Sequence, residues 1–307
     1  MIRIGPGSRE HLSDFVEAKE LASRMNTGAS IARIVKNFSL EMTGKDIPSL
    51  EKAKGVIPQG TRVNVTFLGN EELEMRIAAA KAVKDCGFVP VPHISARRMA
   101  SVAQLEEFLG RLQEIGASEK VFVVGGDPSS PEGPFADSLS VIRTGLLSEY
   151  GVKEVSIAGY PEGHTDISPA VLWQHLEYKV RALEEQGLAA IIITQFGFDV
   201  SAVVTWMRAV RERGIESEIR IGTPGPAGVK RLMAFATRFG VRSNAMIVRK
   251  YGFSLKNLLG TAGPDRFVAD LNRELAGNPV YGNVRLHFYA FGGILPTAEW
   301  AQHSMTS

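Results

Sequence analysis

Three side chains that can exchange protons, Tyr160, Glu162 and His164, lie within five residues of one another in this sequence. They directly follow residues 155–158, an apolar run of the kind that forms a buried strand. Gly159 marks the end of this run, because glycine and proline interrupt strands. A buried strand that ends in a loop carrying phenol, carboxyl and imidazole groups is a common way to position acid–base chemistry. We therefore expect a reactive loop at the carboxyl end of this strand.

Polar side chains recur where the other apolar runs end. Each of them alone has a structural explanation, such as a solvated acid for Glu41, a satisfied core histidine for His93 or a turn former for Asp127. Their recurrence favours one shared site, because the chemistry of parallel barrels lies where the strands end. The residues that end the predicted strands are Glu41, Thr66, His93, Asp127, Tyr160 with His164, Gln195, Thr223 and Tyr289.

The elements that must position these residues alternate regularly along the chain. Alternating strands and helices predict a parallel sheet, and eight such units in 307 residues predict a single (β/α)8 TIM barrel. We expect one domain over 1–307 with an N-terminal helical extension over about 1–35. An open, doubly wound sheet is the alternative, although no Gly-x-Gly-x-x-Gly opens the chain. The expected strands are 35–41, 62–67, 88–93 (with two prolines), 120–124, 153–159, 189–195, 218–221 and 284–289. The expected helices are 9–35, 70–86, 101–115, 135–149, 169–186 and 200–213, with two or three more in 228–277.

Composition narrows the class of protein. With 35 basic and 33 acidic residues the net charge is +2, which gives no reason to expect nucleic acid or an anionic membrane as partner. The single cysteine, Cys86, excludes an internal disulfide and a thiolate metal cluster, and its place at a helix end indicates simple packing. No run reaches the ~18 apolar residues of a membrane span, and no signal peptide is visible at the start. The cytoplasm is the expected location.

Motifs for other chemistries are missing from the sequence. No His-x-x-x-His or Glu-x-x-His pair occurs, so we expect no dedicated metal site. No Gly-x-Ser-x-Gly occurs, which argues against a hydrolase elbow. The glycine-rich residues 222–228 fit either a phosphate cradle at a helix N-terminus or a tight turn, and both interpretations stay open.

Taken together, the strand-end motifs resemble those of the methylenetetrahydrofolate reductases, which are (β/α)8 flavoproteins. The resemblance runs from about 36 to 291 and is most specific in two segments, IAGYPEGH at 157–164 and IITQFGFD at 192–199. Supporting pieces are residues 38–41, Pro92-His93, Gly126-Asp127 and residues 287–289.

The resemblance implies an oxidoreductase of one-carbon metabolism and methionine biosynthesis. It would reduce 5,10-methylenetetrahydrofolate to 5-methyltetrahydrofolate with NADH or NADPH through bound FAD. Glu41 would be the general acid, and Asp127 would act beside the flavin and the pterin. Gln195 and Tyr289 would contact the folate substrate, Gln195 also the nicotinamide nucleotide. The implied cofactor-binding residues are Thr66, His93, Gly126, Asp127, Ala136, Tyr160, His164 and Lys179, the last at the phosphates. Folate and the nucleotide are the expected partners, and homo-oligomerisation stays open.

This chain also departs from the family pattern. Gly125 stands where the family has an arginine, Thr43-Gly44 replaces Pro-Pro, residues 291–293 lack the usual basic and amide groups, and the segment from Lys179 to Gln195 is longer. One alternative is therefore the same reaction, or its reverse in a demethylation pathway, by direct hydride transfer without tightly bound FAD. A second, from another class, is a barrel that binds folate or flavin without catalysis.

Overall fold

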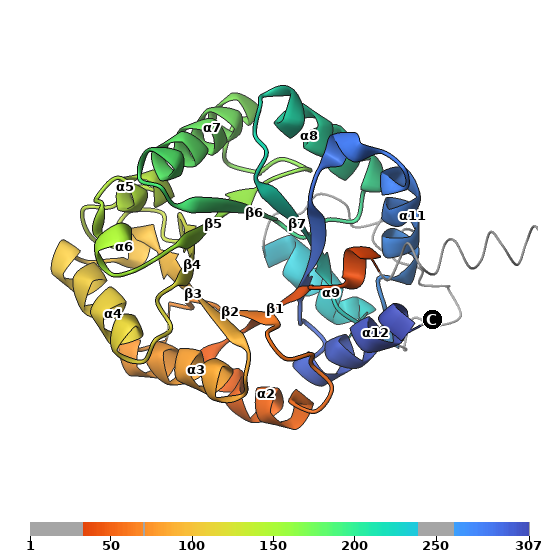
Figure 1. Ribbon diagram of the computed structural model, residues 1–307, viewed down its shortest axis with the longest axis horizontal. Helices are drawn as coiled ribbons and strands as arrows, with labels where there is room; N and C mark the ends of the chain where they lie inside the picture. Colours follow the sequence, from red (N-terminus) through yellow and green to blue (C-terminus); the bar gives the residue numbers. More distant parts are fainter. Residues whose placement is uncertain (1–32, 70, 239–260, 307) are drawn as a thin grey trace, which may run out of the picture.

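Eight parallel strands close into a barrel in the order β1-β10-β7-β6-β5-β4-β3-β2 (Figure 1). The computed structural model describes residues 33–69, 71–238 and 261–306. The predicted (β/α)8 barrel is confirmed, and the open sheet is wrong. The barrel strands are β1 (Ser39–Met42), β2 (Arg62–Val65), β3 (Val89–Ser95), β4 (Lys120–Val124), β5 (Glu154–Gly159), β6 (Ala189–Thr194), β7 (Glu218–Pro224) and β10 (Val284–Tyr289).

Helices form an outer ring around the strands, except α9, which is drawn inside this ring (Figure 1). They are α2 (Ile47–Ala53), α3 (Leu73–Asp85), α4 (Val102–Glu114), α5 (Ser138–Ile142), α6 (Leu146–Glu149), α7 (Pro169–Glu185), α8 (Val200–Glu212), α9 (Val229–Arg238), α11 (Asp265–Leu275) and α12 (Ile294–Thr306). Short 3-10 turns lie at η1 (Gly44–Asp46), η2 (Ala96–Arg98) and η4 (Pro279–Tyr281), and β8 (Ala227–Gly228) pairs antiparallel with β9 (Thr261–Ala262). None of the helices described is long and apolar enough to cross a membrane.

Strand alternation separates the main core from the barrel interior. In β1 the fully buried Leu40 faces the helices and joins the main hydrophobic core, whereas Ser39 and Glu41 face inward. A smaller apolar cluster, which includes Phe122 and Ile191, fills the middle of the barrel. Below it, Arg62 and Lys120 pair with Glu154. These layers close the barrel from below, so the open end is the mouth at the carboxyl ends of the strands.

The two prolines of β3 cost little backbone pairing. Val89 donates its N–H to Thr61 on the β2 side, so alternation turns the nitrogens of Pro90 and Pro92 toward β4. Pairing between β3 and β4 begins only at His93. The missing N–H groups therefore fall before the ladder starts, which explains prolines in an inner strand.

Three predicted boundaries need correction. The first strand begins at Ser39 instead of 35, because Asn37 adopts a left-handed conformation (φ 62°) that ends a preceding helical turn. The helix predicted over 135–149 is split into α5 and α6, since Gly145 at φ 80° breaks it. Helix α3 begins at Leu73, and the predicted cap Asn70 lies outside the described residues. Most of the expected N-terminal extension also lies outside them.

Candidate active site

The β1–β10 pairing places an acid, an imidazole and a hydroxyl in one chain at the mouth. Ser39 pairs with His287, and Glu41 pairs with Tyr289 in the ladder. The fully buried His287 has its Nδ1 atom 2.9 Å from Ser39 Oγ and its Nε2 atom 3.4 Å from Glu41 Oε2. The tautomer of His287 sets the direction of both contacts: with the proton on Nε2, that nitrogen donates to Glu41 and Nδ1 accepts the Ser39 hydroxyl proton. The arrangement fixes one orientation of the imidazole beside Glu41, whose side chain is 19% exposed.

His93, on β3, is a buried neutral imidazole in the same interior. Burial lowers its pKa to about 4, although the nearby Glu41 charge opposes that shift and His287 adds to it. Its ring packs edge-on against Phe122 at a centroid distance of 4.7 Å. His93 Nε2 is buried and has no hydrogen-bond partner in the structure. This nitrogen is thus an unmatched polar atom in the barrel interior.

Further unmatched polar atoms lie on the same inward faces. Asn64 Oδ1 and Thr66 Oγ1 follow the path of β2, and Ser95 Oγ ends β3. Leaving a buried polar group unpaired costs roughly 1–3 kcal/mol. Such a cluster is expected where a polar ligand or ordered water completes the hydrogen bonds.

Two tyrosines extend the mouth, Tyr289 at the end of β10 and Tyr160 directly after β5. Tyr289 donates its hydroxyl to Thr194 O at 3.1 Å, and burial raises its pKa well above the ordinary value, with the charges of Glu41 and Tyr160 adding to the rise. Burial also raises the pKa of Tyr160, whose ring meets His164 edge-on at 5.4 Å. Tyr160, Tyr289 and Glu41 therefore lie in one neighbourhood of uncharged phenols around a carboxyl group.

Gln195 and Thr223 differ in how they meet this site. Gln195 follows β6, and its Oε1 atom accepts from the N–H of Phe196 at 3.0 Å. Thr223 pairs with Phe288, which belongs to the outer core, so its buried side chain points away from the mouth. The prediction that Thr223 ends its strand in the shared site is wrong, because the alternation of β7 turns Gly222 inward instead.

Asp127 lies on an exposed loop after β4 instead of inside the barrel. Its carboxylate is 72% exposed and accepts from Arg98 Nε at 2.9 Å and Nη2 at 2.6 Å. The preceding Gly126 has φ 97°, and a Cβ atom there would collide with Ser95 Oγ. The loop therefore requires glycine at this position. Arg98, from η2, fixes the carboxylate at the rim.

Lys179 lies on α7 and Ala136 lies shortly before α5, and these two helices of the outer ring contact each other. Lys179 is 6% exposed, and burial lowers its pKa to about 8 while the charge of Asp137 opposes the shift. Asp137 caps α5 and lies 3.7 Å from His175 Nδ1. Ala136 precedes this cap and is exposed. Asp137 is the charge that opposes the effect of burial on Lys179, and a bound anion would add to it.

The glycine-rich 222–228 segment ends β7 and forms β8, with Gly225 and Pro226 as the tight link between them. Gly225 donates its N–H to Tyr289 O at 2.9 Å, and a Cβ atom there would collide with Thr297. Residues Ala227–Gly228 then enter the β8–β9 pair. Backbone donors of this loop are thus engaged within the protein, which favours the tight turn over the phosphate cradle.

Sequence reasoning missed three residues of this site. His287 was recognised only as part of a motif, and Arg98 and Asn64 were not considered. Arg98 is 29 residues from Asp127, and His287 is 246 residues from Glu41. A pair of arginines directly after a strand and a histidine two residues before a strand end were the available signals. Among the described residues no group of three or more His, Cys, Asp or Glu side chains is arranged to hold a metal ion.

The fold and the mouth define the class as a (β/α)8-barrel protein with titratable side chains at the carboxyl ends of its strands. Within that class, the chain belongs to the methylenetetrahydrofolate reductase family, whose model matches residues 43–243. This match covers more than half of the chain and includes most of the strand-end residues described above.

Two curated relatives agree with the family. The 5,10-methylenetetrahydrofolate reductase of Pectobacterium carotovorum subsp. carotovorum is 31% identical over 183 residues, which are 59% of this chain and 59% of that protein. Methylenetetrahydrofolate reductase 2 of Saccharomyces cerevisiae is 26% identical over 170 residues, 53% of this chain and 27% of that protein. The chain therefore spans less than two thirds of the length of these curated relatives.

A solved structure supports the fold alone. An uncharacterised protein from Clostridium thermocellum, described as binding two copies of 5-methyl-5,6,7,8-tetrahydrofolic acid, aligns with a TM-score of 0.53. The alignment covers 89% of this chain and 98% of that chain at 11% identity.

Proposed function

We propose that this protein is an oxidoreductase that reduces 5,10-methylenetetrahydrofolate to 5-methyltetrahydrofolate with NADH or NADPH through FAD. Family membership supports the reaction class. The single observation that carries the proposal is the inward Glu41 carboxyl group, held beside His287 and Ser39 at the mouth. A reaction that needs one positioned proton donor fits this arrangement.

Glu41 is the proposed proton donor to the folate. The methylene bridge must open before a hydride can reach its carbon, and opening requires a proton on the leaving amine. Glu41, at the partly buried mouth, would supply this proton, and the contact with His287 would orient its carboxyl group. The neutral His93 nearby adds no competing positive charge, because its pKa is lowered to about 4 by burial.

The mouth residues fit a flat, polar heterocycle such as a flavin. His93 Nε2, Thr66 Oγ1 and Ser95 Oγ are buried without partners, and a ring with several donors and acceptors would satisfy such atoms. Bound FAD would relay the hydride from the nicotinamide to the folate. The residues proposed to hold it are Thr66, His93, Gly126, Asp127, Ala136, Tyr160 and His164 around the ring system, and Lys179 at the phosphates.

Substrate contacts are proposed for the opposite wall. Gln195 would release its Oε1 atom from the Phe196 N–H to meet the pterin or the nicotinamide. Tyr289 stays protonated, since burial raises its pKa well above the usual value, so its hydroxyl remains a donor. Asp127, oriented by Arg98, would accept hydrogen bonds from the pterin.

The direct test is a spectrum and a turnover assay of the pure protein. A flavin absorbance band, with oxidation of NADH or NADPH that requires 5,10-methylenetetrahydrofolate, is the expected result. Absence of folate-dependent oxidation in either direction, with cofactor supplied, would refute the proposed activity.

A second candidate is the same reaction, or its reverse, by direct hydride transfer without tightly bound FAD. Gly125 favours this candidate, because it stands where the family carries an arginine. An added Cβ atom at Gly125 would meet nothing within 4 Å, so packing does not explain why this chain has no side chain there. A colourless protein with folate-dependent turnover would support this candidate. Folate or flavin binding without turnover would support a non-catalytic barrel instead.

A further inference from the structure

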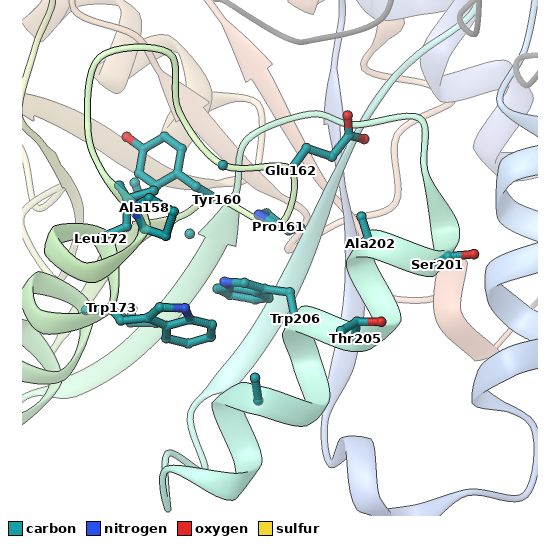
Figure 2. Close-up of a pocket in the computed structure, with 15 residues that line it drawn as sticks. Ala158, Tyr160, Pro161, Glu162, Leu172, Trp173, Ser201, Ala202, Thr205 and Trp206 are labelled. Carbon is teal, nitrogen blue, oxygen red and sulfur yellow. The ribbon is translucent and has the colours of Figure 1, made fainter.

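A cavity lies outside the barrel, between α7 and α8 and under the loop that follows β5 (Figure 2). Its volume is about 630 Å³, within the usual range of small-molecule sites. Tyr160 contributes to its wall and also lies near Tyr289 at the mouth. The cavity thus adjoins the candidate active site and shares Tyr160 with it.

The cavity exists because α8 presents small side chains to α7. Ser201, Ala202, Thr205 and Ala209 recur at helical spacing and line the cavity. Larger residues at these positions would fill the space between the two helices, as they do in an ordinary helical layer. The small residues on one face of α8 therefore leave the space that forms the cavity.

Two indole rings form the floor. Trp173 of α7 and Trp206 of α8 are nearly parallel, with centroids 5.9 Å apart and 22° between the planes. Figure 2 shows them beneath Tyr160, Pro161 and Glu162. Trp173 already has the Arg213 guanidinium over its ring at 3.9 Å. Indole faces attract cations more strongly than other aromatic rings do.

The rim of the cavity is acidic at Glu162. This is the one charged side chain among the described residues that line the cavity, and Arg213, over the Trp173 ring, is not among them. Glu162 Oε1 accepts from the N–H groups of Phe198 and Asp199, so the carboxylate connects the two loops above the floor. Carboxylates around a cleft with apolar walls concentrate a field that attracts cations.

We propose that this cavity is a binding site for a planar aromatic cation. The flat ring would lie on the Trp173 and Trp206 floor, with its charge toward the Glu162 rim. Aromatic stacking, cation–π attraction and the acidic rim all favour this ligand class over a neutral or anionic one of the same shape. The inference does not depend on the reaction proposed for the barrel mouth.

Matched probes test both shape and charge. 9-Aminoacridine is a planar cation at neutral pH, and acridine-9-carboxylate has the same ring system with a negative charge. The chain has three tryptophans, so the Trp300→Phe variant leaves fluorescence from the two floor residues alone. In this background 9-aminoacridine should quench the emission with a Kd at least tenfold lower than that of the carboxylate. The preference should shrink as salt is raised.

Variants locate the binding. Thr205→Phe and Ala209→Leu each place bulk into the cavity and should raise the Kd for 9-aminoacridine at least tenfold. Ala103→Phe, at an exposed position on α4, should leave it unchanged. Glu162→Gln keeps an acceptor for the loop amides and should weaken the cation preference at least threefold. Circular dichroism identifies any variant that fails to fold. If one of the two cavity-filling variants does not fold, the Kd of the other one tests the proposal.

Three outcomes would overturn the proposal. The first is no quenching by 9-aminoacridine, and the second is equal affinity for the two probes. The third is binding that survives cavity filling in a folded variant, which would indicate association with the surface only.

Discussion

His287 bridges Ser39 and Glu41, with its Nδ1 atom 2.9 Å from the serine hydroxyl and its Nε2 atom 3.4 Å from the glutamate carboxylate. The bridge spans two adjacent strands and is buried at the imidazole. It ties the orientation of the proposed acid to the register of β1 on β10. A one-residue slip of that register would turn Glu41 out of the mouth.

The first prediction concerns Glu41 as proton donor. Glu41→Gln keeps the shape and removes the acid, so folate reduction should fall by about 10²–10⁴, the usual effect of losing a general acid. Flavin reduction by NAD(P)H should persist, because it needs no proton from this residue. Stopped-flow measurement of each half-reaction separates the two. Glu107→Gln, at an exposed position, is the control. Less than about a twofold change in the folate step would remove Glu41 from the mechanism.

The second prediction concerns Ser39 as a positioning residue. Ser39→Ala leaves His287 Nδ1 buried without its partner, which costs roughly 1–3 kcal/mol and frees the ring to reorient. The folate half-reaction should slow by about 5–50-fold, and its pH profile should shift, while flavin reduction stays near wild type. The control is Ser156→Ala, which changes another buried, inward-facing serine. It should change neither the rate of the folate half-reaction nor its pH profile. An unchanged pH profile in Ser39→Ala would show that the bridge is only structural.

The third prediction concerns the buried charge of Lys179. Burial lowers the pKa of this ammonium to about 8, so at neutral pH the group is mostly charged. Holding this charge away from water lowers the unfolding free energy. Lys179→Met should raise the unfolding free energy of the flavin-free protein by roughly 1–3 kcal/mol. The same variant should weaken FAD binding by about 1–3 kcal/mol, since a charge-assisted contact is lost.

Urea unfolding and flavin titration measure these two effects independently. Lys81→Met, which removes an exposed lysine of α3, should change neither quantity by more than about 0.5 kcal/mol. A stabilised variant with unchanged flavin affinity would place the phosphates elsewhere.

The fourth prediction concerns stability below neutral pH. His93 has a pKa of about 4 in the folded protein against an ordinary value of 6.5, because burial disfavours its charged form. Between these values the unfolded chain binds more protons, so the unfolding free energy falls as the pH falls. The contribution is present in full above about pH 6.5 and is lost by about pH 4, a total of roughly 3 kcal/mol.

Urea unfolding at several pH values between 4 and 7.5 measures this slope. His93→Gln should flatten it by up to about 1.4 kcal/mol per pH unit, whereas His303→Gln, at an exposed position, should leave it intact. The same slope in His93→Gln and wild type would contradict the assignment.

The regular alternation of apolar runs and helical segments was enough to predict the barrel. Eight strands, such as 284–289, fell within a few residues of their observed limits. Local signals also set helix ends, as where Ser101 caps α4 and Gly187 at φ 68° follows α7. Period and capping are properties of neighbouring residues, so the sequence expresses them directly.

Breaks within helices and the first residues of strands were harder to predict from the sequence. Gly145 splits a predicted helix, and Asn37 delays the first strand, because both adopt positive φ values that composition alone does not require. The prolines of β3 lie in an inner strand, where proline removes a donor from the ladder. Only the register shows that their nitrogens fall before pairing with β4 begins.

The residues Glu41, His93, Tyr160 and Tyr289 were read from the chain as strand ends, and that much the sequence determined by itself. Their partners came only with the tertiary structure. His287 meets Glu41 across 246 positions, and Arg98 reaches Asp127 from a different strand end. Burial lowered the pKa values of His93 and Lys179, and the register of β7 on β10 turned Thr223 away from the mouth. Strand register and desolvation depend on how distant segments pack, and no local pattern of residue types encodes them.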